Sequence, residues 1–407
     1  MSGAANGSAH GAANGAANGA ANGAANGAAN GAANGAGAGD PRPVLVTGGA
    51  GFVGCNLADR LLREGRSVLV LDTLGRPGVE RNLAWLRATH GDRVRAVVAD
   101  VRDAGAVTRA VREAAEVYHF AAQVAVTTSL ADPVEDFDVN ARGTLHVLEA
   151  IRRVGEERGE APPLLFTSTN KVYGDLADVA MHAEGRRYAP ADAALRAHGV
   201  SERRPLDFHS PYGCSKGAAD QYVLDYARSY GVPAVVFRMS CIYGPRQFGT
   251  EDQGWVAHFL IRALEGRPIV LYGDGLQVRD LLFVDDLVDA MLVARRHVAR
   301  LAGRAFNIGG GVGNTTSLLE LLDRIAELRG AAPAVAFEGW RTGDQRYYVS
   351  DVRAFGEATG WAPRTGIGDG LARLHEWLVA SRAGTSPGTA PGAASGGARP
   401  VGAGAAA

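Results

Sequence analysis

Short apolar runs alternate with segments of helical periodicity from about residue 43 to residue 240. Runs of β-branched and aliphatic residues with the length of buried strands lie at 43–47, 67–72, 94–99, 117–120, 164–167 and 234–238. Between them, apolar residues recur at helical spacing at 56–64, 104–115, 133–154 and 216–230. Strands that alternate with helices form βαβ units, whose right-handed crossovers produce a parallel sheet. The pattern therefore predicts an α/β fold, a doubly wound Rossmann sheet with helices on both faces.

The second half of the chain has a less regular pattern. Helices are predicted at 253–266, 285–299 and 317–329, and a strand is predicted at 269–272. We expect a Rossmann domain over 41–240 and a smaller C-terminal substrate-binding lobe over 241–382, partly interleaved with the first domain. Open α/β sheets bind ligands at the carboxyl ends of their strands, so a lobe placed there closes a substrate cleft.

Both ends of the chain carry little apolar surface. Residues 4–35 are almost entirely repeats of Ala-Ala-Asn-Gly, and residues 383–407 are mostly Gly, Ala, Pro, Ser and Thr. Neither composition can offset the entropy of ordering the backbone. We therefore predict disordered tails over 1–40 and 383–407, and we interpret the repeat as a flexible spacer.

Charge and cysteine content exclude several classes of protein. The net charge is −1 and the isoelectric point is about 6.8, without a basic run, which argues against binding to nucleic acid or a membrane surface. No apolar stretch has the length of a membrane span, and the N-terminus does not resemble a secretory signal. The three cysteines are odd in number and lack metal-ligand spacing. We expect a cytoplasmic globular protein without a metal site.

The basic residues are unevenly divided between arginine and lysine. Of the 42 basic residues, only Lys171 and Lys216 are lysines. An ammonium is compact and its pKa can be tuned, whereas a guanidinium stays charged. These two lysines are therefore candidates for chemistry that arginine cannot perform.

A glycine-rich turn lies between the first predicted strand and the first predicted helix. Its glycines are Gly48, Gly51 and Gly54, with Phe52 and Val53 in the same turn. Glycines let the backbone approach a pyrophosphate, and the helix N-terminus supplies free N–H groups and a positive dipole. This context predicts binding of a dinucleotide.

Acidic and small residues at the following strand ends extend the predicted cofactor site. Asp72 closes the second strand, where a carboxylate accepts hydrogen bonds from the ribose of NAD and repels the 2′-phosphate of NADP. Arg76, four residues later, keeps NADP as an alternative cofactor at this place. Later strand ends add the candidates Asp100, Val101, Ala121, Ala122 and Gln123. We expect NAD as the cofactor.

Tyr212 and Lys216 are four residues apart in a helical segment, so their side chains share one face. A free tyrosine titrates near 10 and is a poor base at neutral pH. A neighbouring ammonium and a positive nicotinamide ring both favour the phenolate. Thr169, with Ser168 as the alternative, follows the fifth strand and can hold the substrate oxygen while Tyr212 takes its proton. These four residues are the predicted catalytic group.

Together, the G-x-x-G-x-x-G turn and the hydroxyl–Tyr–Lys group resemble the extended short-chain dehydrogenase/reductases. Longer segments narrow the resemblance to the CDP-paratose 2-epimerase family, also called CDP-tyvelose 2-epimerases. These segments are 168–175, 206–221, 246–249, 252–255, 277–280, 305–310 and 343–346. Cys241 supports the resemblance to this family, because most of the superfamily carries Asn at that position. The resemblance implies an NAD-dependent nucleotide-sugar epimerase that inverts C2 by transient oxidation to a ketosugar.

The same resemblance separates this chain from the nucleotide-sugar 4,6-dehydratases. Those enzymes carry Asp-Glu directly after the catalytic threonine, and this chain carries Asn170 and Lys171 there. Without these acids, loss of water is disfavoured. Lys171 is expected either to bond the sugar or to brace the loop. The alternative function is another nucleotide-sugar epimerase or a reductase of the same group, for example one acting in a secondary-metabolite pathway.

The substrate is expected to lie against the second lobe. By resemblance, arginines of this lobe hold the diphosphate and nucleoside of a nucleotide sugar, with a CDP-sugar expected. The predicted substrate-binding residues are Lys171, Arg246, Gln247, Arg279, Arg341 and Asp344. Relatives pair through helices that flank the sheet, which implies a homodimer or homotetramer.

Overall fold

The computed structural model describes residues 40–341 and 343–383. The predicted disordered tails lie outside these residues, apart from Asp40 and Ala383. Within the described ranges, no helix combines the length and the apolar character that crossing a membrane requires.

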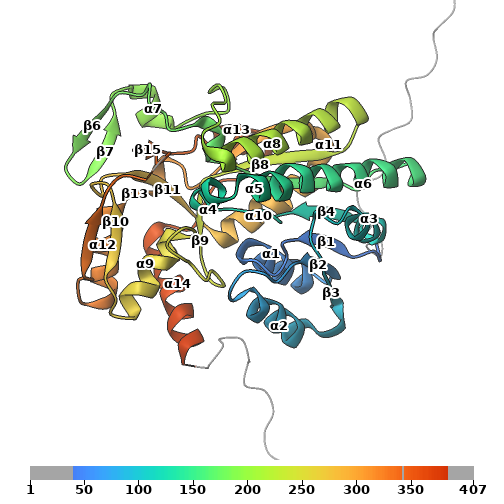
Figure 1. Ribbon diagram of the computed structural model, residues 1–407, viewed down its shortest axis with the longest axis horizontal. Coiled ribbons are helices and arrows are strands. Elements are labelled where there is room, and N and C mark those ends of the chain that lie inside the picture. Colours follow the sequence, from blue (N-terminus) through green and yellow to red (C-terminus); the bar gives the residue numbers. More distant parts are fainter. Residues whose placement is uncertain (1–39, 342, 384–407) are drawn as a thin grey trace, which may run out of the picture. The chain divides into compact units, whose positions relative to one another are not determined.

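A seven-stranded parallel sheet forms the centre of the fold, in the order β12-β8-β5-β4-β1-β2-β3 (Figure 1). Its strands are β1 (Val44–Thr47), β2 (Val68–Asp72), β3 (Val94–Val98), β4 (Glu116–His119), β5 (Leu164–Thr169), β8 (Ala234–Met239) and β12 (Arg304–Ile308). The predicted Rossmann class is confirmed. The strand that the pattern did not predict is β12, which comes from the second half of the chain and interleaves it with the sheet.

Helices cover both faces of this sheet, because alternate strand residues point to opposite sides. In β1, Leu45 packs into one apolar core, while Val44 and Val46 pack into the other. On the first face lie α3 (Ala104–Glu113), α6 (Gly143–Arg158) and α8 (Ser210–Tyr230). On the second face lie α1 (Phe52–Arg63), α2 (Val79–His90), α10 (Val284–Arg296) and α13 (Arg353–Thr359).

Two helices that lead into the cleft differ from their predicted bounds. The predicted helix at 133–154 is divided into α5 (Pro133–Phe137), a π-helical turn (Asp138–Arg142) and α6, while α4 (Val126–Ala131) precedes them. Helix α8 begins at Ser210 rather than at 216. Pro211 occupies its first turn, where a missing N–H costs nothing. As a result, Tyr212 and Lys216 lie on the first turns of one helix.

The second lobe packs around its own apolar core. Its sheets contain β9 (Cys241–Tyr243), β10 (Ile269–Tyr272), β11 (Val278–Phe283), β13 (Thr315–Ser317), β14 (Val335–Glu338) and β15 (Tyr347–Tyr348). Its helices are α9 (Trp255–Leu264), α12 (Leu318–Arg329) and α14 (Ile367–Arg382), and smaller elements are β6 (Met181–Glu184), β7 (Arg187–Pro190), α7 (Ala193–His198) and α11 (Val298–Leu301). One compact unit begins at Asp40 and contains both lobes, so a domain boundary at residue 240 stays a prediction.

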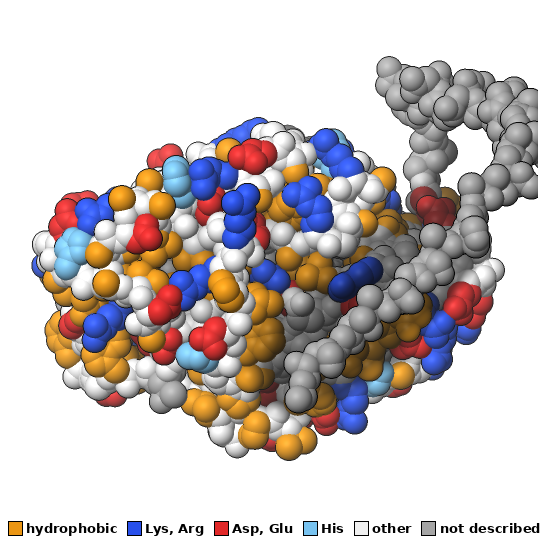
Figure 2. Space-filling model, turned by 90° about the horizontal axis from the view of Figure 1, so that it is seen from above, with side chains coloured by type: hydrophobic (Ala, Val, Ile, Leu, Met, Phe, Trp, Pro, Cys, Tyr) orange, Lys and Arg blue, Asp and Glu red, His pale blue; other side chains and the backbone are white. Residues whose placement is uncertain are grey.

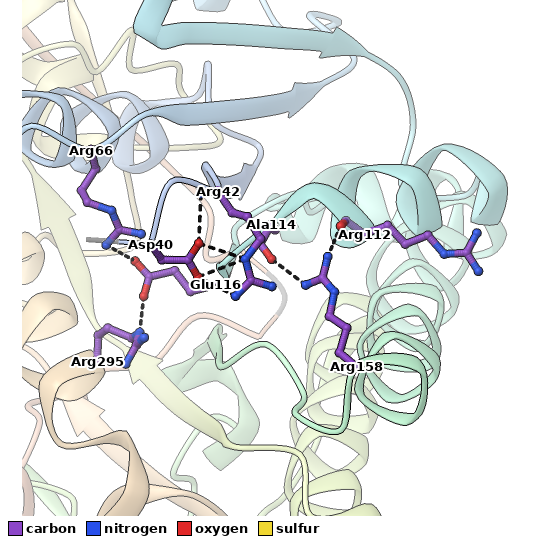
Figure 3. A network of polar contacts seen from close by, with 8 residues as sticks. All are labelled: Asp40, Arg42, Arg66, Arg112, Ala114, Glu116, Arg158 and Arg295. Carbon is purple, nitrogen blue, oxygen red and sulfur yellow. Dashed lines mark hydrogen bonds and ion pairs between the residues drawn. The ribbon is translucent and has the colours of Figure 1, made fainter. Parts of the chain in front are cut away.

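Paired charges close the amino end of the sheet. Glu116, the first residue of β4, is 2 % exposed and accepts hydrogen bonds from Arg66 at 3.3 Å and from Arg295 (Figure 3). Nearby, the Arg42 guanidinium is paired with Asp40. Over the face drawn in Figure 2, basic and acidic side chains are interspersed. At this end of the fold, a buried carboxylate is thus balanced by two guanidinium groups.

Candidate active site

The glycine turn between β1 and α1 needs glycine for steric reasons. Gly48 has φ +67°, and a Cβ on it would lie 2.7 Å from the backbone N of Ala121. A Cβ on Gly54 would lie 2.4 Å from the carbonyl oxygen of Gly48. The backbone is thus packed as closely as it can be, and the start of α1 at Phe52 faces a large cavity together with these glycines.

Asp72 lies at the carboxyl end of β2 and lines the same cavity. One carboxylate oxygen accepts the backbone N–H of Ala50 at 3.0 Å, and the other accepts that of Leu74 at 2.9 Å. These bonds fix the carboxylate, and each oxygen keeps a second lone pair. Arg76 also lines the cavity, where burial lowers the pKa of its guanidinium and the charge of Asp72 raises it.

The next strand ends continue this wall. The Asp100 carboxylate accepts the backbone N–H of Arg102 at 2.8 Å and its guanidinium at 2.7 Å. The backbone N–H of Gln123 donates to Asn140 Oδ1 at 2.9 Å. All the predicted cofactor-binding residues line the one cavity: Gly48, Gly51, Phe52, Val53, Gly54, Asp72, Asp100, Val101, Ala121, Ala122, Gln123, Tyr212 and Lys216.

The predicted catalytic residues form a single wall of the cavity. The Thr169 hydroxyl accepts the backbone N–H of Lys171 at 3.2 Å and donates to Asn170 Oδ1 at 3.3 Å. The neighbouring Ser168 is 3 % exposed, and its hydroxyl has no partner among the described residues. Both hydroxyls line the cavity with Tyr212, so Thr169 as its partner, with Ser168 as the alternative, stays a prediction.

Burial governs the charges of the Tyr–Lys pair. It raises the pKa of Tyr212 to about 12, a shift that the polar side chain of Thr169 opposes and the charge of Asp136 reinforces. Burial also lowers the pKa of Lys216 to about 7, while the charges of Asp220 and Asp136 raise it. The Lys216 ammonium lies 4.3 Å from the centre of the Phe166 ring. The chain's own groups therefore do not give Tyr212 the lowered pKa that the sequence suggested.

The other lysine lies on the second-lobe side of the cavity. Lys171 Nζ donates to the carbonyl oxygen of Gly343 at 3.1 Å, and burial lowers its pKa to about 8. The Arg279 guanidinium, which is 8 % exposed, donates to Asp344 at 2.7 Å. Both lysines of the chain thus line one cavity, and Lys171 is bonded to the loop that carries Asp344.

Arg341 shapes the rim of this cavity. Its guanidinium lies 3.7 Å from the centre of the Tyr272 ring and donates to Glu251 at 2.9 Å. Gln247 lines the cavity as well, and its amide donates to the carbonyl oxygen of Ile242 at 3.2 Å.

Arg246 is the predicted substrate-binding residue that the structure does not bring to the cavity. Its backbone has φ +72°, and its guanidinium lies 3.2 Å from the centre of the Trp85 ring on α2. Stacking on an indole is a favourable use of a partly desolvated cation. The contact of Arg246 with substrate stays a prediction, and in this structure the side chain packs between α2 and the loop after β9.

Sequence reasoning missed the polar residues behind the Tyr–Lys pair, Asp136, Asn140 and Ser215. All three are buried and bonded to one another. Their contacts join α5, the π-helical turn and α8, so the relation depends on the folded chain. The only local signal was an asparagine inside a predicted helix, where its propensity is poor.

The cavity, about 1260 Å³ in volume, fits a dinucleotide together with a sugar nucleotide. A turn whose Cβ positions are filled by backbone, a helix start and a fixed carboxylate suit a pyrophosphate and a ribose. A fold with these features and a hydroxyl–Tyr–Lys group at the strand ends defines a dinucleotide-dependent enzyme of the short-chain dehydrogenase/reductase type.

Comparisons with known proteins specify the family. The model of the NAD dependent epimerase/dehydratase family matches residues 44–309. The chain is 40 % identical over 341 residues to CDP-paratose 2-epimerase from Salmonella typhi, covering 82 % of this chain and 98 % of that protein. The chain belongs to the NAD dependent epimerase/dehydratase family, and it is an NAD-dependent nucleotide-sugar enzyme.

Solved structures agree with this placement. UDP-glucose 4-epimerase from Thermus thermophilus, solved in complex with NAD, is 34 % identical with a TM-score of 0.68, covering 83 % of this chain and 99 % of that chain. A dTDP-glucose 4,6-dehydratase from Streptomyces venezuelae, also solved with NAD, is 29 % identical with a TM-score of 0.71, covering 85 % of this chain and 99 % of that chain. The same fold therefore serves both epimerases and dehydratases.

Proposed function

We propose that this enzyme inverts C2 of a CDP-linked 3,6-dideoxyhexose and so interconverts CDP-paratose and CDP-tyvelose. The observation that carries the proposal is that Thr169, Tyr212 and the buried Lys216 line the same cavity as the glycine turn. Likeness to the Salmonella typhi 2-epimerase over nearly its whole length supports the substrate.

The proposed roles of the residues follow from their chemistry. NAD, held by the glycine turn and Asp72, supplies a hydride acceptor and a positively charged ring when bound. Thr169 holds the C2 oxygen by a hydrogen bond, and Tyr212 accepts the hydroxyl proton. Lys216 stabilises the phenolate that this step requires, and Tyr212 returns the proton in the reverse step.

Inversion needs the sugar to present its other face. One base suffices, because the ketosugar can turn about its diphosphate linkage inside the cleft. Arg279 and Arg341 hold that diphosphate, since a guanidinium suits bidentate phosphate contacts, and Asp344 binds the nucleoside ribose. Lys171 bonds the sugar or keeps the loop of Asp344 in place, and its bond to Gly343 supports the second role.

Dehydration is the activity that this site disfavours. Asn170 and Lys171 follow Thr169, so the two carboxylic acids that serve the dehydratases at these positions are absent here. The Asn170 amide is instead 8 % exposed and donates to Gln345 at 3.2 Å. We therefore favour epimerisation over loss of water.

The proposal is tested by incubating the purified enzyme with CDP-paratose and, separately, with UDP and GDP sugars. NMR should show the 2-epimer from the CDP sugar alone. Substrate deuterated at C2 should keep its label in the product, without incorporation from solvent. Turnover of only a UDP or GDP sugar would identify another nucleotide-sugar epimerase, and net consumption of NADH would identify a reductase.

We also propose that the enzyme is a cytoplasmic homodimer or homotetramer. Apolar side chains are exposed on the helices that flank the sheet, including Phe137 on α5 and Tyr222 on α8. Covering them in a second copy would remove this apolar surface from water. Light scattering on the eluted protein measures the mass, and a monomer would contradict the proposal.

A further inference from the structure

A buried carboxylate lies behind the Tyr212–Lys216 pair and has no role in the proposed function. Asp136, on α5, is 0 % exposed. Its two oxygens accept hydrogen bonds from Ser215 Oγ at 2.5 Å and from Asn140 Nδ2 at 3.1 Å. Within residues 40–341 and 343–383, no arginine, lysine or histidine forms an ion pair with it. A carboxylate this deeply buried needs a reason to be present.

The hydrogen bonds around Asp136 suit an ionised carboxylate, and the charge of Lys216 opposes the rise in the pKa of Asp136 that burial causes. The backbone N–H of Gln123 can only donate, so the Asn140 atom that it meets at 2.9 Å is the amide oxygen. Asn140 therefore turns its NH₂ group toward Asp136 and toward Ser215 Oγ, at 3.0 Å. Ser215 accepts that bond, and its single proton is shared between Asp136, at 2.5 Å, and the carbonyl oxygen of Tyr212, at 3.2 Å. Both carboxylate oxygens thus lie within hydrogen-bond distance of a polar side chain.

Two acids act on the charge of Lys216, and Asp136 is the one that no cation pairs with among the described residues. The other acid whose charge acts on Lys216 is Asp220, one turn further along α8. Asp220 is held by the Arg238 guanidinium from β8 through two bonds of 2.9 Å, so a cation already balances its charge. From β4, the charge of Lys216 acts on His119, whose pKa burial lowers to about 3, so the imidazole is neutral. Asp136 alone remains to balance the ammonium.

We propose that Asp136 is the counter-charge that keeps Lys216 protonated in the wall of the cavity, and that it acts as a positioning residue through Ser215. Ser215 lies directly before Lys216 and also bonds the carbonyl oxygen of Tyr212 at 3.2 Å, so one hydroxyl links the carboxylate to both ends of the pair. The catalytic consequence rests on the proposed function, whereas the effect on Lys216 does not.

The charge of Asp136 acts in the same direction on both members of the pair. It raises the pKa of Lys216 and that of Tyr212. An Asp136→Asn variant should therefore lower both values, each by roughly one pH unit. A residue that only supports the fold would change stability without moving either titration.

The lysine content of the chain allows a direct test. Protein labelled with ¹³Cε-lysine has only two lysine signals, from Lys171 and Lys216. Lys171→Arg removes one signal and so assigns the other. In Asp136→Asn, the Lys216 midpoint should fall by about one pH unit while the Lys171 midpoint stays in place. Asp138→Asn is the matched control, because that carboxylate lies in the next turn and pairs with Arg142 on the surface. An unchanged Lys216 midpoint in Asp136→Asn overturns the proposal.

Turnover gives the second readout. Both limbs of the kcat–pH profile should move to lower pH in Asp136→Asn, and neither should move in Asp138→Asn. If the NMR midpoint moves but the profile does not, the counter-charge stands and the role assigned to Lys216 in turnover fails. If Asp136→Asn does not fold, Asp136→Asn/Ser215→Ala removes the same charge with one donor fewer to satisfy. The same NMR titration then decides the question.

Discussion

The two ends of the four-residue strand β4 have opposite surroundings for a buried polar side chain. At the amino end, Glu116 is enclosed and bonded to two guanidinium groups (Figure 3). At the carboxyl end, His119 is just as buried but meets only the neutral hydroxyls of Thr47, at 2.6 Å, and Thr144, at 3.1 Å. The amino end therefore pairs a buried charge with cations, and the carboxyl end pairs a buried imidazole with uncharged hydroxyls.

The difference has an energetic reason. Leaving a buried polar group unpaired costs about 1–3 kcal/mol, and the carboxyl end carries such groups, including the hydroxyl of Ser168. A site that must accept a cofactor and a sugar keeps such groups available to them. The closed charge network and the two apolar cores stabilise the sheet that holds this site in place.

The largest effect on turnover is expected for Tyr212→Phe, a change in the cavity at the carboxyl ends of the strands. Removing the phenol oxygen leaves no group to accept the sugar proton, so kcat should fall about 10²–10⁴-fold. The free energy of unfolding should change little, because the phenol faces the cavity. Steady-state rates and urea unfolding on the same preparation measure both quantities.

Cys214→Ser is the control for this variant. Cys214 lies on the same turn of α8 and is exposed, so its replacement should leave kcat within about twofold. Full turnover by Tyr212→Phe would mean that the chain keeps the fold without the proposed chemistry.

Local patterns predicted the parts of this molecule that depend on neighbours in sequence. The alternation of strands and helices predicted six of the seven sheet strands, and the glycine spacing placed Gly48 and Gly54 at a turn whose Cβ positions backbone atoms fill. The scarcity of lysine singled out Lys171 and Lys216, which now line one cavity. Each of these signals is local or compositional.

Local sequence patterns did not predict contacts between segments that are distant in sequence. Strand β12 joins the main sheet through pairing with β8, which no local pattern encodes. In the sequence, Asp136 looks like an ordinary acid near the start of a helix. In the fold, it forms a hydrogen bond with Ser215 from α8. Arg246 adjoins a cavity residue in sequence, but an irregular backbone turns it onto Trp85. Tertiary contacts decide these three positions.

The neutral carboxyl end of β4 should make the fold sensitive to acid. His119 has a pKa of about 3 in the folded protein and near 6.5 when unfolded, so between these values the unfolded state binds an extra proton. Its contribution is complete above pH 6.5 and is lost as the pH falls, at about 1.4 kcal/mol per unit. By pH 5 the loss should reach about 2 kcal/mol.

Urea unfolding between pH 7 and 5 measures this slope, and His119→Asn should reduce it. The variant is less stable at every pH, so the slope and not the absolute stability is the readout. His182→Asn should keep the wild-type slope, because that imidazole is exposed to solvent. An equal slope in His119→Asn and the wild type would show that His119 takes up its proton in the folded protein as well.

The smallest of these effects is expected at the amino end of β4. Glu116→Gln removes the charge that balances Arg66 and Arg295, whose side chains are 30 % and 39 % exposed. Breaking a fully buried pair costs about 3–5 kcal/mol, and partial hydration of the arginines reduces the expected loss to about 1–2 kcal/mol. Glu64→Gln breaks an exposed pair and should cost less than about 1 kcal/mol. Urea unfolding measures both losses, and kcat should stay within about twofold, because Glu116 lies outside the cavity. A Glu116→Gln variant that kept its stability and lost turnover would contradict the interpretation that the amino end of β4 stabilises the fold and the carboxyl end serves the site.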